Sequence, residues 1–210
     1  MRNHLSKLSG LTEDIRRQLN ELVHPVALGD PLQEPRHRAF IAGCLGSGAA
    51  ALLILPLHLA LLGPTTLPVA LVLAWLLGQW PLALYLSQTG KIERAHALSA
   101  TLFASFLAGL CLFTGGLSSF ALLWLAVVPM EAALSGSRRV ILGTAVLCLV
   151  FVAGLAVIGG HTASYDLATP HAMLISALVA SGYMAVLALR LALDQKRSRA
   201  VMLAGEERLK

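Results

Sequence analysis

Apolar residues along this chain gather in six long runs, which short polar segments separate. The runs cover residues 40–62, 67–86, 97–113, 117–134, 140–158 and 173–193. A helix rises about 1.5 Å per residue, so about 20 apolar residues cross the roughly 30 Å hydrocarbon core of a bilayer. The pattern predicts an all-α integral membrane protein in which residues 39–193 form a bundle of six transmembrane helices, paired as three hairpins.

The N-terminal segment has a different periodicity. Aliphatic residues recur there every three or four positions, at 11, 15, 19 and 22, with charged residues between them. This spacing predicts an amphipathic helix over residues 11–23, which the pair His24-Pro25 ends. The helix is expected either to lie on the inner leaflet or to pack on a partner helix. Residues 26–38, which contain two prolines, are expected to form a linker, so that residues 1–38 are a cytoplasmic region.

The positions of the basic residues predict the orientation. All sixteen lie before the first run, in the second or fourth interruption, or from the end of the sixth run onward: Arg2, Lys7, Arg16, Arg17, Arg36, Arg38, Lys91, Arg94, Arg138, Arg139, Arg190, Lys196, Arg197, Arg199, Arg208 and Lys210. A six-span path places all of them on one side, and the positive-inside rule makes that side cytoplasmic, with both termini. The net charge of +5 is then mainly an orientation signal. Attraction to membrane lipid is secondary, and nucleic-acid binding is not indicated.

Composition agrees with this class of protein. Hydrophobic residues make up 57% of the 210 residues and charged residues 13%, which excludes an ordinary soluble globule and a disordered chain. The three cysteines, Cys44, Cys111 and Cys148, lie in apolar runs and form no ligand cluster, so we expect small buried side chains. No catalytic, cofactor-binding or metal-binding motif is present.

Glu131 is the one acidic residue inside a predicted span, and it lies close to Pro129. An ionisable residue at membrane depth is costly and is by default a candidate for function. Because the run ends at Leu134, Glu131 is also near enough to the interface to pair with Arg138 or Arg139. The sequence leaves two interpretations open, a structural anchor and a role in signalling or ion movement. Pro129 permits a kink beside the acid.

A second group of candidates lies in the long interruption between the fifth and sixth runs, on the outer side. His161, Asp166 and His171 are residue types that bind metals or sense pH. Their spacing matches no compact metal motif, so solvated loop residues are the competing interpretation.

Small residues form a stripe on the first predicted span. Gly43, Ser47 and Ala51 recur every four positions. Such a stripe favours a close helix contact, either within one chain or between two chains.

The last run continues without proline into residues 194–210, which are rich in helix-forming residues. We expect one helix that leaves the membrane on the cytoplasmic side and is cut by the end of the sequence.

Several short segments carry a resemblance to a known family: Leu22-Val23-His24-Pro25, Arg36-His37-Arg38-Ala39-Phe40-Ile41-Ala42, Glu93-Arg94-Ala95-His96, Gly115-Gly116-Leu117-Ser118-Ser119-Phe120, then Trp124, Pro129, Glu131-Ala132-Ala133-Leu134 and Ser135-Gly136-Ser137-Arg138-Arg139. Over residues 11–200 the chain resembles the N-terminal membrane region of DivJ-type sensor histidine kinases of alphaproteobacteria. No phosphoacceptor or ATP-binding motif lies in residues 1–210, so no catalytic residue is carried over.

The resemblance implies a membrane-embedded sensory and anchoring input module of a two-component sensor histidine kinase, in the bacterial inner membrane. It also implies a homodimer whose last span leads to cytoplasmic kinase domains and, through them, to a response regulator. A small six-span transporter or channel and a passive membrane anchor are the alternative functions.

The topology is testable with a reporter enzyme that is active only outside the cytoplasm. We expect activity for fusions at Thr65, Gly116 or Asp166, because these residues lie in interruptions without basic residues. Fusions at Lys91 or Arg138 should be inactive, and the opposite pattern would contradict the orientation.

Overall fold

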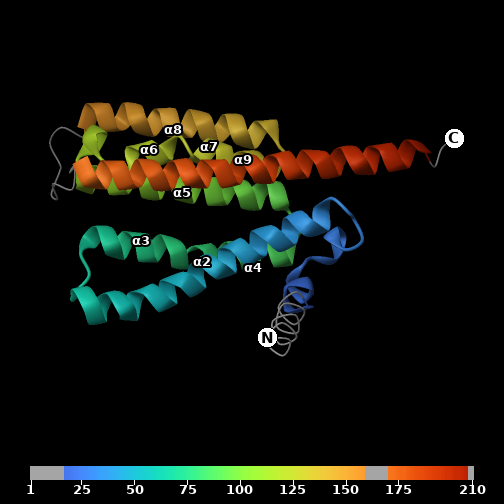
Figure 1. The fold of residues 1–210 in the computed structure, drawn as a ribbon, viewed down its shortest axis with the longest axis horizontal. Coiled ribbons are helices and arrows are strands. Elements are labelled where there is room, and N and C mark those ends of the chain that lie inside the picture. The colour runs from blue at the N-terminus through green and yellow to red at the C-terminus, as the bar shows by residue number, and fades with distance from the viewer. Residues whose placement is uncertain (1–16, 159–169, 208–210) are drawn as a thin grey trace, which may run out of the picture.

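A computed structural model of the chain describes residues 17–158 and 170–207, which form helices and turns and no strands. The helices are α2 (Gln33–Leu62), α3 (Leu67–Leu77), α4 (Gln79–Thr89), α5 (Ile92–Thr114), α6 (Leu122–Leu125), α7 (Val128–Ala132), α8 (Arg138–Ile158) and α9 (Pro170–Glu207), with 3₁₀ turns η1 (Pro25–Ala27), η2 (Gly116–Ser118) and η3 (Ala133–Ser135). Figure 1 shows the long helices lying side by side, with the chain reversing direction at their connections.

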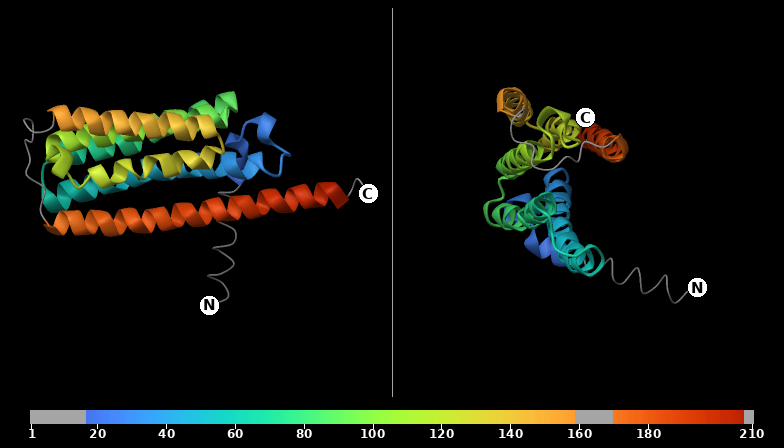
Figure 2. Two further views of the ribbon diagram at one scale, coloured as in Figure 1. Left: turned by 90° about the horizontal axis from the view of Figure 1, so that it is seen from above. Right: turned by 90° about the vertical axis from the view of Figure 1, so that its left-hand side faces the viewer.

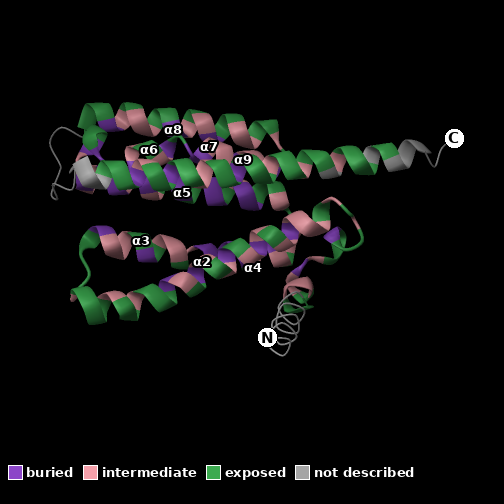
Figure 3. Ribbon diagram, in the orientation of Figure 1, coloured by how far each residue is buried: buried purple, intermediate pink, exposed green. Residues whose placement is uncertain are grey.

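Five helical stretches of the described chain are long and apolar enough to cross a membrane: Gln33–Leu62, Leu67–Thr89, Ile92–Thr114, Arg138–Ile158 and Met173–Val201. They correspond to five of the six predicted spans, and the all-helical class is confirmed. Large apolar side chains such as Leu149 and Val157 are exposed on the outside of the bundle, as the green faces of α8 and α9 in Figure 3 show. Such an apolar outer surface is compatible with a lipid environment.

The fourth predicted span, residues 117–134, is not one continuous helix. It consists of η2, α6, α7 and η3, and its apolar helical part, Leu122–Ser135, is shorter than a membrane span. We call residues 116–135 the broken segment. Gly115 and Gly116 begin it with positive φ angles of 123° and 59°, which a residue with a side chain rarely adopts.

Prolines determine where two of the helices end. A proline ring collides with the carbonyl group four residues earlier and supplies no N–H to it. α6 ends at Leu125, four residues before Pro129, and α3 ends at Leu77, four residues before Pro81. This effect cannot be predicted from the apolar composition of a run, because it depends on backbone hydrogen bonds and not on how apolar the side chains are. Each break therefore divides an apolar run into two shorter helices.

α5 is the central helix of the bundle. It packs against α3 and α4 on one side and against α7 and α8 on the other, and Figure 2 shows these two groups of helices end-on. Its buried face includes Phe103, whose ring stacks on Trp75 of α3 with centroids 4.8 Å apart. Cys111 of α5 and Cys148 of α8 are free and buried in the same cluster, as expected, and Cys44 of α2 is also free and buried.

The face of α2 that packs against the bundle is only partly the face that carries the predicted stripe of small residues. Ile41, Cys44, Gly48 and Ala51 are the buried face of α2, whereas Gly43 is exposed and Ser47 is half-buried. Gly48 lies directly against the Trp80 indole of α4, since a Cβ atom there would be 1.8 Å from Nε1. The indole N–H also donates to the Leu45 carbonyl at 3.2 Å. The contact is thus made within one chain.

The described part of the N-terminal segment packs on the end of this bundle. Residues 17–22 are helical, and Val23 is buried beside Ile41 and Leu86. α2 begins at Gln33, inside the segment expected to be a linker, because Asp30 Oδ1 accepts from the backbone N–H groups of Leu32 and Gln33 at 2.8 and 3.1 Å. A side chain that caps orphan N–H groups in this way favours a helix start. Residues 11–16 of the predicted amphipathic helix lie outside the described residues.

The contact at Gly48 gives a stability prediction. Gly48→Ala should lower the free energy of unfolding in detergent by about 1–3 kcal/mol, because the new methyl group overpacks the contact with Trp80. Gly46→Ala is the matched control on the same helix, where a Cβ meets nothing within 4 Å. This control should be neutral or stabilising, because alanine favours a helix over glycine. Equal behaviour of the two variants in a chemical unfolding titration would contradict the contact.

Candidate functional site

The last helix, α9, is held by the broken segment and by the start of α2. It lies along one side of the bundle and continues beyond the other helices (Figures 1 and 2). The residues that make its contacts form one stripe: Ser176, Ala180, Tyr183, Met184, Leu187 and Asp194. At 100° per residue these six residues fall within roughly 100° of the helix circumference. Most other described residues of α9 are exposed or half-buried, so this stripe is the candidate functional site.

The first contact satisfies the beginning of the broken segment. The Ser176 hydroxyl donates to the Phe120 carbonyl at 2.9 Å, and the Trp124 indole N–H donates to the Ser176 oxygen at 3.0 Å. On the other side of the break, the Ser119 hydroxyl oxygen accepts from the backbone N–H of Ala121 at 3.1 Å and lies 2.6 Å from Thr114 Oγ1. Side chains thus replace the helical hydrogen bonds that are lost between η2 and α6.

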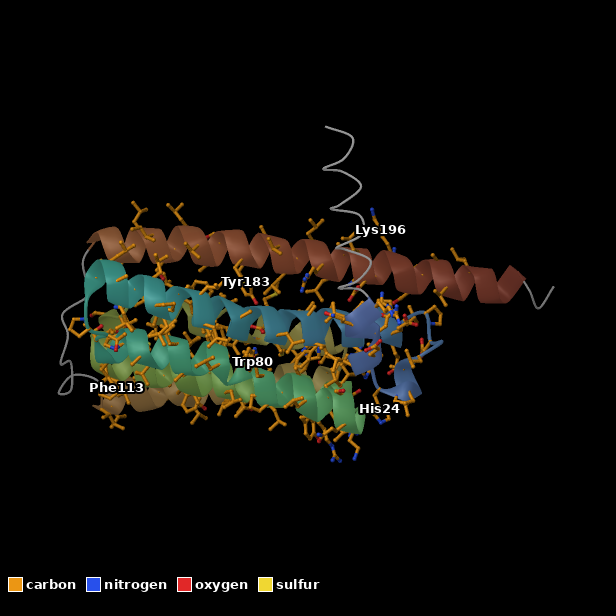
Figure 4. All side chains as sticks on the ribbon, turned by 90° about the horizontal axis from the view of Figure 1, so that it is seen from below. His24, Trp80, Phe113, Tyr183 and Lys196 are labelled. Atoms are coloured by element: carbon orange, nitrogen blue, oxygen red, sulfur yellow. The ribbon has the colours of Figure 1, made fainter. Side chains whose placement is uncertain are left out.

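The second contact lies in the middle of α9. Val127 of the broken segment is buried against Ala180 and Leu187. The ring of Tyr183 lies 5.9 Å from that of Trp124 between centroids, and its hydroxyl group is hydrogen-bonded to the Glu131 carboxylate. Figure 4 shows Tyr183 directed from α9 toward the neighbouring helices, whereas Lys196, one-third of the way from the helix end, points away from them.

The partner of Glu131 is Tyr183, whereas the sequence led us to expect Arg138 or Arg139. Arg138 and Arg139 are exposed at the start of α8, and the ion pairs of the described chain are Arg17–Glu21, Arg36–Asp194 and Arg38–Glu34. Neither arginine therefore forms the expected salt bridge with Glu131. The half-buried carboxylate of Glu131 instead connects the short helix α7 to Tyr183 of α9, 52 residues later in the chain. Pro129 lies two residues before Glu131, in the first turn of α7.

The third contact joins α2, the first long helix of the described chain, to α9, the last one. Arg36 Nε of α2 lies 3.7 Å from Asp194 Oδ2 of α9, and both side chains are about one-third exposed, at 34% and 30%. Gly136, with φ +72°, leaves room for the guanidinium, since a Cβ atom there would be 3.3 Å from Arg36 Nη1. A glycine is thus needed at Gly136 both for the turn after η3 and for the approach of Arg36.

Arg36 lines two cavities. The first has a volume of about 580 Å³ and is lined by Arg36, Lys91 and Arg94, among others, and the second has about 300 Å³ and is lined by Arg36, Asp194 and Arg199, among others. The first also contacts Ser135, so the start of α2, the turn before α5 and η3 share one end of the bundle, which we call the basic end. Basic residues that the sequence separates by more than 50 positions are therefore brought together.

The outer-loop candidates are not among the side chains that the structure describes. His161 and Asp166 lie outside the described residues, and His171 is in the first turn of α9 with a side chain that is not described. Over residues 17–158 and 170–207, no three His, Cys, Asp or Glu side chains are placed to hold a metal ion.

Sequence reasoning did not single out Ser176, Tyr183 or Asp194. A signal was present, because the first two are polar residues in an apolar run and the three are seven and eleven residues apart, which places them on one face of a helix. The partners Phe120, Trp124 and Arg36 had no such local signal, since they are more than 50 residues away.

Comparison of the chain with protein-family models, with curated proteins and with solved structures gave no match. The function is therefore inferred from the residues and their geometry.

The Glu131–Tyr183 contact is testable by stability. Glu131→Gln and Tyr183→Phe should each lower the free energy of unfolding by about 1–2 kcal/mol, because each weakens or removes a partly buried hydrogen bond to a charged group. The double variant should lose less than the sum of the two, as expected for residues in direct contact.

The matched control for this pair is Arg138→Gln combined with Arg139→Gln. These exposed side chains should change the unfolding free energy by no more than about 0.5 kcal/mol. A loss that equals that of Glu131→Gln would show that the acid is paired with the arginines instead.

Proposed function

We propose that the chain is the membrane-embedded input module of a two-component sensor histidine kinase. In this proposal it crosses the bacterial inner membrane six times, with the broken segment as the fourth crossing and both termini in the cytoplasm. It acts as a homodimer, and α9 passes a change in the bundle to a cytoplasmic kinase core and, through it, to a response regulator. The membrane lipid surrounds the apolar faces.

The proposal rests on one observation about α9: it is packed against the bundle and also extends beyond it. One stripe of α9 is held by the bundle, and the same helix continues without a break to Glu207, a length of about 57 Å for its 38 residues. The hydrocarbon core takes up about 30 Å of this length, so about 27 Å extends beyond it. A rigid helix that joins a membrane bundle to the aqueous phase can transmit rotation, translation or tilt.

A second face of α9 is available to a partner. Ala188, Ala192, Gln195 and Arg199 are exposed, and they are centred about 100° around the helix from the stripe that the bundle holds, with Gln195 and Arg199 also at the edge of the smaller cavity. Their spacing of three or four residues is a weak match to a coiled-coil seam. A movement of the stripe against the broken segment would therefore change the angular position of this second face in a dimer.

The test is a chimera in which the full chain is joined after Lys210 to the dimerisation and ATP-binding domains of a well-characterised histidine kinase. One, two, three, four or seven alanines are inserted after Lys196, and autophosphorylation is measured in lipid nanodiscs. We expect activity to vary with a period near 3.5 residues and to return with seven inserted alanines, because the kinase domains then regain their helical phase.

The same insertions after Gly29 are the matched control. This exposed glycine lies in the turn before α2, so the insertions lengthen the chain without rotating α9. They should leave autophosphorylation unchanged. A smooth decline of activity with insert length in α9 would contradict signalling by phase and would favour the passive anchor.

A further inference from the structure

The larger cavity at the basic end has the lining of an anion site. Arg36 enters it from α2, and Lys91 and Arg94 enter it from the start of α5. Lys91 and Arg94 form no ion pair with another described residue. The cavity therefore has two unpaired cations and a third, Arg36, whose one acidic partner, Asp194, lines the smaller cavity and not this one.

The acidic residues of the lining do not cancel this charge. Asp30 is engaged with the backbone, because its Oδ1 accepts from Leu32 and Gln33 at the start of α2. Glu93 is exposed in the first turn of α5. Three cations against two carboxylates, one of them engaged, leave a positive field in a concave space, where charge-assisted hydrogen bonds to an anion are strongest.

We propose that this cavity binds a phosphate group, either that of an anionic phospholipid headgroup or that of a soluble phosphate compound. A guanidinium presents paired N–H donors that match two phosphate oxygens, and Lys91 adds a point charge. The volume of about 580 Å³ lies within the range of small-molecule sites and accommodates a headgroup with its glycerol. In the proposed topology the cavity lies at the cytoplasmic end of the apolar helices, where headgroups of the inner leaflet would be found.

The site also has a connection to α9. Arg36 lines both cavities, and its Nε pairs with Asp194 of α9. A phosphate in the larger cavity competes with Asp194 for this guanidinium, so binding weakens the contact that holds the last helix. This coupling deepens the proposed function and rests on it, whereas the binding itself does not.

The binding test uses the full chain in a neutral maltoside detergent. A fluorescent short-chain phosphatidylglycerol is titrated, and its anisotropy reports binding. We expect a saturable curve that unlabelled phosphatidylglycerol reverses and zwitterionic phosphatidylcholine does not. Reversal by inorganic phosphate at millimolar concentration identifies a soluble anion as ligand, and reversal by the lipid alone identifies the headgroup. A curve without saturation overturns the proposal.

Paired variants separate a built site from general charge attraction. Lys91→Gln with Arg94→Gln should weaken binding roughly tenfold or more, because two charge-assisted contacts are lost. Arg138→Gln with Arg139→Gln removes the same charge from exposed residues that line neither cavity, and should change affinity less than twofold. Equal losses in the two pairs overturn the proposal. All four side chains are exposed, and circular dichroism checks that the variants fold.

Asp194→Asn tests whether Asp194 and the phosphate compete for Arg36, because competition predicts that this variant increases the affinity for the lipid. This variant frees the guanidinium and should tighten binding severalfold, whereas Glu21→Gln, which removes an exposed acid of the N-terminal helix, should not. Unchanged affinity in Asp194→Asn overturns the competition. Because these measurements need no kinase domain, their failure is distinguishable from a failure of the phase experiment.

Discussion

A bilayer offers no water to backbone groups, so a helix that is broken at membrane depth must satisfy its N–H and C=O groups within the protein. In the proposed arrangement the broken segment is the fourth crossing, and it meets this requirement through its neighbours. The Ser119 hydroxyl oxygen accepts a hydrogen bond from the N–H of Ala121, and the Ser176 hydroxyl donates one to the carbonyl of Phe120. The second of these bonds comes from α9. The break and the position of the last helix are therefore one feature, since the segment is complete only while α9 lies beside it.

The same constraint explains the arrangement around the break. The segment packs against α5 and α8 as well as α9, so protein covers it on several sides, whereas the continuous helix α8 exposes a wide apolar face. A continuous helix satisfies its own backbone and can face lipid directly. A broken one has to be placed inside the bundle, and this requirement makes α5, with its largely buried face, the central element.

The sequence predicted the features that depend on local patterns. Apolar runs located the five long helices, and Pro129 indicated where the fourth run could kink. It did not predict the breaks as such, because Pro56 lies inside the continuous helix α2, whereas Pro129 follows a break. The stripe of small residues was predicted only in part: Ala51 is on the buried face of α2, whereas Gly43 lies roughly 120° from the centre of that face. The partner of Glu131 was missed because Tyr183 is distant in sequence and Arg138 is near.

The two polar contacts at the ends of the stripe make α9 a lever. If a bound phosphate draws Arg36 away from Asp194, as proposed above, the last contact that still holds α9 is Leu187, which is packed against Val127. Asp194 is seven residues beyond Leu187, about 10 Å along the axis, and Glu207 is twenty residues beyond it, about 30 Å. A sideways displacement of 1 Å at Asp194 then becomes about 3 Å at Glu207, in proportion to these lengths. A small change at one guanidinium is thereby amplified at the far end of the helix, without any change in the helix itself.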